Sequence, residues 1–116
     1  MIVGLGIDII EIERVAFAIK RHGPVFIDRL FTKREQKSDS ATYYAGRFAA
    51  KEAVVKALGT GFRGIGWKDI EIVADTLGKP IVILAPHLQA RFSNPQLHLS
   101  ISHSKETACA FCIWER

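Results

Sequence analysis

The chain has 116 residues, of which 48% are hydrophobic and 24% are charged. This length and composition favour one globular domain, so we expect residues 1–116 to fold as a single unit. No apolar run reaches the ~20 residues that a membrane-spanning helix needs. The apolar start lacks a basic leader and carries Asp8, which is atypical of a signal peptide. We therefore expect a cytoplasmic protein, small enough that a neighbouring subunit would be useful to complete an active site.

The net charge is +4, and the excess lies between residues 14 and 37, where seven basic side chains accompany two acidic ones. Such a basic patch suits an acidic partner, which could be a nucleic acid, a phosphorylated ligand or an acidic protein. A solvated basic face is the plainer alternative. The aromatic content of 9% offers no base-stacking platform, which weakens the case for nucleic acid.

Apolar periodicity and the positions of glycine and proline predict the elements of the fold. In chain order they are a strand over 2–10, a helix from residue 11 to the Gly23-Pro24 stop, a short helix over 25–31, a long helix over 41–58, strands over 67–75 and 81–84, a short helix over 86–92, and strands over 97–103 and 108–114. Thr32 and Glu35 have the spacing of a capping box. This order favours an α+β fold in which a mostly antiparallel sheet packs against a long central helix.

Cys109 and Cys112 form a C-x-x-C pattern in the last predicted strand. Residues three apart in a strand point to opposite faces and lie roughly 10 Å apart, too far for a disulfide. A zinc site would need two more ligands. We therefore expect two reduced packing residues in a reducing compartment.

Glu52 is unusual because it lies in the long helix 41–58, which is apolar over much of its circumference. A buried carboxylate is costly unless it is paired or binds a metal. Lys56, one turn later, offers a simple ion pair as the structural alternative. Arg47 and Lys51 add two cations on the adjoining face, which we interpret as solvated charges at the helix edge.

Asp8 is the second unusual residue, since it follows an apolar strand and precedes a helix. Its structural role would be to cap that helix. Together with Glu52 it would instead form a carboxylate pair, which is a normal way to hold Mg²⁺ beside a substrate phosphate.

The loop from Gly59 to Gly66 could line a phosphate site with its backbone N–H groups. It is not a P-loop, because the lysine precedes the glycines and the loop ends a helix instead of opening one. Simple loop flexibility is the alternative. His103 lies in an alternating strand among Ser100, Ser102 and Ser104, where it could be structural or could supply a switchable cation.

The chain resembles the holo-acyl-carrier-protein synthases, a family of phosphopantetheinyl transferases. The resemblance rests on four segments that follow the family's order and cover nearly the whole chain. They are Gly4–Arg14, similar to G-x-D-(I/V)-x-x-(I/V)-x-R; Arg47–Gly61, similar to R-F-A-x-K-E-A-x-x-K-A-x-G-T-G; Asp69–Ile72 with Gly78–Pro80; and Ser100–Ser104. The second segment is highly specific.

The resemblance implies transfer of the 4′-phosphopantetheine arm of coenzyme A to a serine of an acyl carrier protein, for fatty acid biosynthesis. It implies an α+β homotrimer with active sites between subunits. The site residues that it implies are Asp8 and Glu52 for Mg²⁺; Arg47, Lys56, Gly59, Thr60, Gly61 and His103 near the coenzyme A phosphates; and Arg14 and Arg21 for docking the acidic carrier. Glu52 would act as the base, and Lys56 would stabilise the departing adenosine 3′,5′-bisphosphate.

Two other functions stay open at this point. The first is a basic binding module without chemistry, which leaves Glu52 unexplained. The second is a transferase for polyketide or peptide-synthetase carriers, but those enzymes are usually about twice this length. The segment 32–44 is shorter than in typical members of the family, so carrier preference is open.

Overall fold

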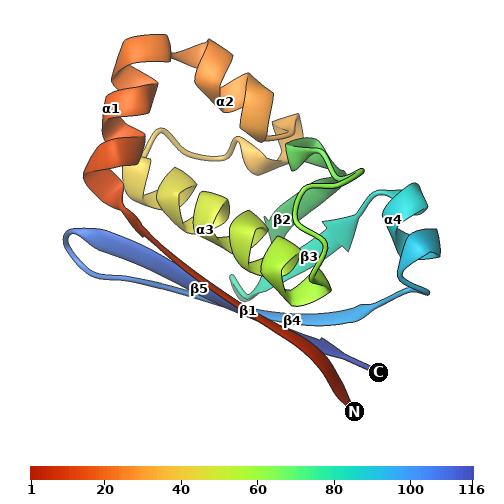
Figure 1. Ribbon diagram of the computed structural model, residues 1–116. Coiled ribbons are helices and arrows are strands. Elements are labelled where there is room, and N and C mark those ends of the chain that lie inside the picture. The colour runs from red at the N-terminus through yellow and green to blue at the C-terminus, as the bar shows by residue number, and fades with distance from the viewer.

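The computed structural model describes the whole chain, residues 1–116. One long helix, α3, lies between two antiparallel sheets and beneath two shorter helices (Figure 1). The elements are β1 (Ile2–Glu11), α1 (Ile12–His22), α2 (Pro24–Leu30), the 3₁₀ turn η1 (Lys33–Glu35), α3 (Ala41–Leu58), the 3₁₀ turn η2 (Trp67–Asp69), β2 (Ile70–Ala74), β3 (Pro80–Leu84), α4 (Pro86–Arg91), β4 (Gln96–His103) and β5 (Thr107–Glu115).

The predicted α+β class and the antiparallel pairing are confirmed. The strands form two sheets, however: a three-stranded sheet in the order β1-β5-β4 and a separate β2-β3 hairpin. The prediction of a strand from residue 67 was wrong for its first three residues, which form η2. The Asp69 carboxylate accepts the Gly66 N–H at 2.7 Å and holds this turn ahead of β2.

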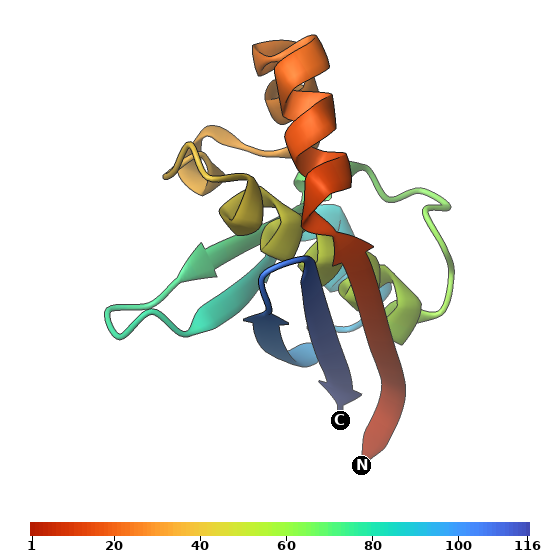
Figure 2. The ribbon, with the colours of Figure 1, turned by 90° about the vertical axis from the view of Figure 1, so that its left-hand side faces the viewer.

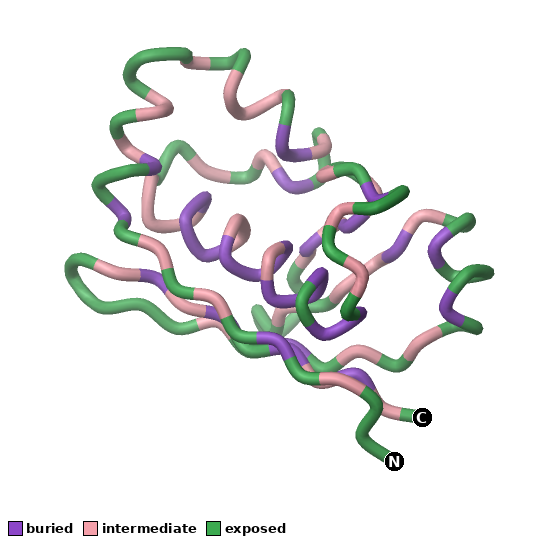
Figure 3. The backbone as a smooth tube through the Cα atoms, in the orientation of Figure 1, coloured by how far each residue is buried: buried purple, intermediate pink, exposed green.

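Local signals explain why α3 has its predicted bounds. The Ser40 hydroxyl accepts the Tyr43 N–H and caps the first turn. Gly59 adopts the left-handed conformation at φ 80° and ends the helix. Most of α3 is buried in Figure 3, because its larger apolar cluster joins both sheets and α4 and its first turns pack on α1 and α2.

Strand β1 crosses α3 in direct backbone contact. A Cβ at Gly6 would lie 1.8 Å from the Ala53 carbonyl oxygen, and one at Gly4 would lie 2.0 Å from that of Ala57. Only glycine fits at these two positions. The small side chains of Ala53 and Ala57 complete the close approach, which places the end of β1 beside the middle of α3.

Lys51 does not lie at the edge of the helix, so our interpretation of it as a solvated charge was wrong. Its side chain is 0% exposed, and its Nζ donates to Glu35 Oε1 at 2.7 Å and to the carbonyl oxygens of Leu30 and Trp67. The other Glu35 oxygen accepts the Ile72 N–H at 2.8 Å. Burial lowers the pKa of Lys51, and the Glu35 carboxylate opposes that shift. This ion pair joins α2, η1, α3, η2 and β2.

Two smaller expectations concern the end of the chain and the capping box. Thr32 and Glu35 do form a capping box, around η1. Cys109 is half-buried and Cys112 is fully buried on opposite faces of β5, and both are free thiols.

None of the helices combines the length and the apolar character that crossing a bilayer requires.

We predict that Gly6→Ala lowers the free energy of unfolding by more than about 3 kcal/mol, because its methyl group would overlap a helix carbonyl that cannot move freely. Gly59→Ala is the matched control. It introduces the same methyl into open space and costs only the left-handed strain, about 1–2 kcal/mol. Urea denaturation measures both. Equal losses in the two variants would contradict the close approach.

Candidate active site

The close approach of β1 to α3 brings three predicted site residues together. Asp8 points toward α3 from β1, and Glu52 and Lys56 lie one turn apart on the side of α3 that faces it. Lys56 Nζ donates to Asp8 Oδ1 at 3.2 Å and to the Ile7 carbonyl oxygen at 2.9 Å. The predicted grouping of these side chains is therefore present in a single chain.

The two structural alternatives for these residues are not observed. Lys56 forms its ion pair with Asp8 and not with Glu52. Asp8 does not cap α1, because β1 continues to Glu11 and that position makes no side-chain capping bond. Glu52 is thus left without an ion-pair partner, beside an Asp8 that is paired with Lys56.

The environment of Glu52 makes it more basic than an ordinary carboxylate. Burial raises its pKa, and the negative charge of Asp8 raises it further, while Lys56 partly opposes both effects. A pair of like charges held together in this way is stabilised when a cation binds between them.

The donor set fits Mg²⁺. This ion typically takes one or two protein carboxylates and completes its octahedron with water and substrate phosphate oxygens. Asp8 and Glu52 supply two carboxylates at the surface of the molecule, and Glu52 has no cationic partner of its own. Asp8 already attracts one cation, the Lys56 ammonium.

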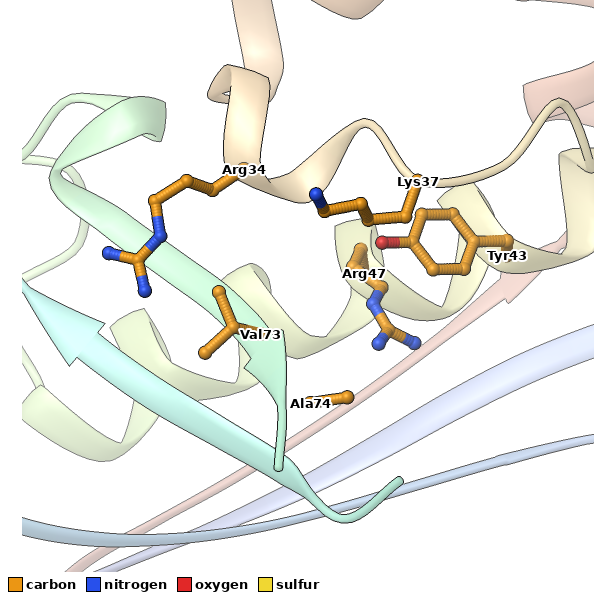
Figure 4. Close-up of a pocket in the computed structure, with 6 residues that line it drawn as sticks. All are labelled: Arg34, Lys37, Tyr43, Arg47, Val73 and Ala74. Atoms are coloured by element: carbon orange, nitrogen blue, oxygen red, sulfur yellow. The ribbon is translucent and has the colours of Figure 1, made fainter. Parts of the chain in front are cut away.

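Arg47 and His103 form a second group, on the other side of α3. They line a cavity of 360 Å³ between the first turns of α3 and the end of β4. Arg47 also lines an adjoining cavity of 330 Å³ with Arg34 and Lys37, shown in Figure 4. We predicted that Arg47 lies near a phosphate of the substrate. In the structure it shares a cavity with two other cations, Arg34 and Lys37.

The two groups do not share a cleft within one chain. Arg47 and Glu52 are five residues apart, so they point about 140° away from each other around α3. Asp8 and His103 lie on the helix-facing side of the same sheet, but β1 and β4 are its opposite edges with β5 between them. Helix α3 therefore separates the carboxylates from the Arg47 cavities.

The loop after α3 is anchored by aromatic packing. Phe62 lies 4.4 Å from Trp67 between ring centroids, and Trp67 stacks on Phe48 at 5.1 Å. Gly59 and Gly61 have positive φ, and nothing lies within 4 Å of a Cβ built at either. Their backbone is therefore open to a ligand at the end of α3 that carries Lys56, and Thr60 lies between them.

The predicted docking arginines lie on α1. Arg14 and Arg21 are both exposed, and a spacing of seven residues places them on one face of the helix. Figure 2 shows α1 standing beyond the end of β1, which is the strand that carries Asp8. The basic face and the carboxylates are therefore connected by only a few residues of chain.

Sequence reasoning missed the residues that surround Arg47. Arg34, Lys37 and Tyr43 line its cavity, and Tyr43 packs on its guanidinium. The sequence marks Arg34 and Lys37 only as members of the basic segment 14–37. The burial of Lys51, by contrast, had a signal in the sequence. Its side of the helix is apolar, since it is shared by Tyr44, Phe48, Val55 and Leu58.

The sequence model of the 4′-phosphopantetheinyl transferase superfamily matches residues 4–112. The chain belongs to this superfamily. A holo-[acyl-carrier-protein] synthase of Protochlamydia amoebophila is 52% identical to this transferase over 120 aligned residues, which cover 98% of each chain.

Solved structures agree with that assignment. A holo-[acyl-carrier-protein] synthase from Neisseria meningitidis is 37% identical and superposes with a TM-score of 0.90 over 100% of both chains. The Helicobacter pylori enzyme, solved in complex with coenzyme A, is 33% identical with a TM-score of 0.89, covering 96% of this transferase and 99% of that chain.

We predict that Glu52→Gln stabilises the metal-free protein at neutral pH and nearly abolishes its turnover. The folded-state pKa of Glu52 is raised, so its ionised form costs stability, and that cost grows as pH rises through this pKa. Glutamine cannot ionise and avoids the cost. Urea denaturation in EDTA at acid and neutral pH measures the first effect, and a transfer assay measures the second. Near-normal turnover would contradict the assignment of Glu52.

Proposed function

We infer that this protein transfers the 4′-phosphopantetheine arm of coenzyme A to a serine of an apo acyl carrier protein and releases adenosine 3′,5′-bisphosphate. The observation that carries this function is the grouping of Asp8, Glu52 and Lys56 at the end of β1, in a chain that matches holo-[acyl-carrier-protein] synthases over nearly its whole length. A carboxylate pair beside a lysine suits a pyrophosphate substrate and its metal ion.

The residues of the site have separate roles in this reaction. The serine oxygen attacks the pantetheine-side phosphorus, the bond from that phosphorus to the bridging oxygen breaks, and the bisphosphate leaves. Glu52 accepts the serine proton, directly or through water, and its raised pKa strengthens it as a base. Lys56 stabilises the charge that grows on the leaving oxygen.

Asp8 and Glu52 would hold Mg²⁺, which supplies Lewis-acid polarisation of the pyrophosphate when it is bound. In this proposal the half-exposed Lys56 exchanges its hydrogen bonds with Ile7 and Asp8 for contacts with the phosphates. The open backbone of Gly59, Thr60 and Gly61 offers N–H groups to the donor. Because phosphoryl transfer depends on positioning and charge stabilisation, these residues suffice without a covalent intermediate.

Intact-mass analysis of an apo acyl carrier protein, incubated with coenzyme A, Mg²⁺ and this protein, tests the function. We expect a gain of one phosphopantetheine, which EDTA abolishes and which a carrier with Ser→Ala at the acceptor position does not show. A folded protein that binds coenzyme A but modifies no carrier would contradict the enzyme and favour the binding-module alternative.

We propose that α1 docks the carrier through Arg14 and Arg21. The basic segment that begins there suits an acidic protein, and the exposed face of α1 leads along the chain to Asp8. Cys109 and Cys112 remain free thiols, as is usual in the cytoplasm, which is the compartment that we propose for the reaction.

Changing Arg14 and Arg21 together to glutamate should raise the KM for carrier protein at least about tenfold at low ionic strength, because two attractive charges become repulsive. The KM for coenzyme A should not change. Steady-state kinetics with each substrate varied in turn separates the two constants. A loss of coenzyme A binding would contradict docking through α1.

We further propose that three copies assemble with active sites between them. The outer face of β1 and β5 is apolar and at least partly exposed: Leu5, Ile7 and Ile9 of β1 lie opposite Ile113, Phe111 and Cys109 of β5. A contiguous apolar face of this kind is typical of a protein interface. Assembly would also bring the Arg47 cavities of one chain to the carboxylates of another, which one chain keeps on opposite sides of α3.

Ile7→Glu should therefore yield monomers with little transfer activity, because it places a charge at the centre of this face, where Ile7 is 62% exposed in the isolated chain. Leu77→Glu is the control, since Leu77 is 93% exposed at the tip of the β2-β3 hairpin, away from that face. Sedimentation velocity measures the assembly. A trimeric Ile7→Glu variant would contradict the interface.

A further inference from the structure

Arg47 is held in place without any hydrogen bond or ion pair. Its Nε atom is buried and has no hydrogen-bond partner, and no carboxylate lies within reach of its guanidinium. Arg34, which lines the same cavity, is by contrast paired with Glu71 at 3.3 Å. Arg47 thus keeps its full charge available to an incoming anion.

The contact that orients Arg47 is with an aromatic ring. The guanidinium carbon lies 4.3 Å from the centre of the Tyr43 ring, within the range of a cation–π interaction. Figure 4 shows the guanidinium below this ring, with Lys37 above both and Arg34 across the cavity. Because this contact uses no hydrogen bond, the N–H groups of the guanidinium remain unpaired, and such groups can bind phosphate oxygens in pairs.

Tyr43 is itself connected to the buried ion pair of Glu35 and Lys51. Its hydroxyl donates to the Glu35 carbonyl oxygen, and the Glu35 side chain is bonded to Lys51 and to the Ile72 N–H. Tyr44 packs edge-on against the Tyr43 ring at 5.1 Å. The ring therefore has little freedom, and it limits the freedom of the arginine that lies on it.

We propose that Tyr43 is a positioning residue for the donor substrate: its ring holds Arg47 so that the guanidinium edge meets an anionic group of coenzyme A. Tyr43 touches no reacting atom and acts only through Arg47. The inference rests on the proposed function, because it takes coenzyme A as the source of the anion. The inference assigns part of the affinity for coenzyme A to the contact between Tyr43 and Arg47, apart from the carboxylates that we propose for the chemistry.

The test compares Tyr43→Leu, which removes the ring, with Tyr43→Phe, which keeps the ring and loses only the hydroxyl. Calorimetry measures the Kd for adenosine 3′,5′-bisphosphate, and kinetics gives KM and kcat for coenzyme A. We expect Tyr43→Leu to weaken bisphosphate binding about three- to thirtyfold and to raise the KM with little change in kcat. Tyr43→Phe should restore most of the affinity.

A double-mutant cycle separates positioning from a general structural role. In an Arg47→Met background, where no guanidinium is left to orient, Tyr43→Leu should cause no further loss of bisphosphate affinity. An equal loss in both backgrounds, or unchanged affinity in Tyr43→Leu, would overturn the inference while the wild type still binds and transfers. Failure of the wild-type protein to bind the bisphosphate would instead overturn the proposed function and this inference with it.

Discussion

The backbone contact between β1 and α3 is the constraint on which the rest of the structure depends. Gly4 and Gly6 allow the strand to lie against the carbonyl oxygens of Ala57 and Ala53, closer than any side chain permits. That contact brings Asp8 beside Glu52 and Lys56. It also places α3 between two groups of polar residues, because Arg47 and His103 lie on the side of the helix opposite the carboxylates. The same packing that brings Asp8 beside Glu52 thus leaves the Arg47 cavities on the far side of α3 within one chain.

The buried Lys51–Glu35 ion pair has a complementary role. It orders the connection from α2 through η1 to α3 and fixes β2 against that connection. Removing one partner of such a pair typically costs about 3–5 kcal/mol, because the other charge stays buried and unpaired. From this pair the contacts continue through the Glu35 carbonyl to Tyr43 and on to Arg47. The best-buried charges of the fold therefore support Arg47, whose guanidinium has no ion-pair partner of its own.

Local signals made much of the fold predictable. The bounds of α3 follow from Ser40 and Gly59, and the carboxylate pair follows from the misplaced acids Asp8 and Glu52. The division into two sheets and the burial of Lys51 were not predictable in the same way, because both depend on contacts between distant segments. Glu35 lies 16 residues from Lys51 and reaches it only because η1 turns back over α3. The separation of Arg47 from Glu52 was predictable, because residues five apart in a helix point in different directions. Within one chain, no residue connects the carboxylates to the Arg47 cavities.

Subunit mixing tests the shared site most directly. One chain would carry Glu52→Gln and keep its Arg47 cavities, and a second would carry Arg47→Met and keep its carboxylates. Each protein alone should have little transfer activity. If the site takes its carboxylates from one subunit and its arginine from the next, the two proteins should regain activity when they are dissociated and reassembled together. Reassembled mixtures that stay as inactive as the separate variants would contradict the account, because they would show that each chain must supply both groups itself.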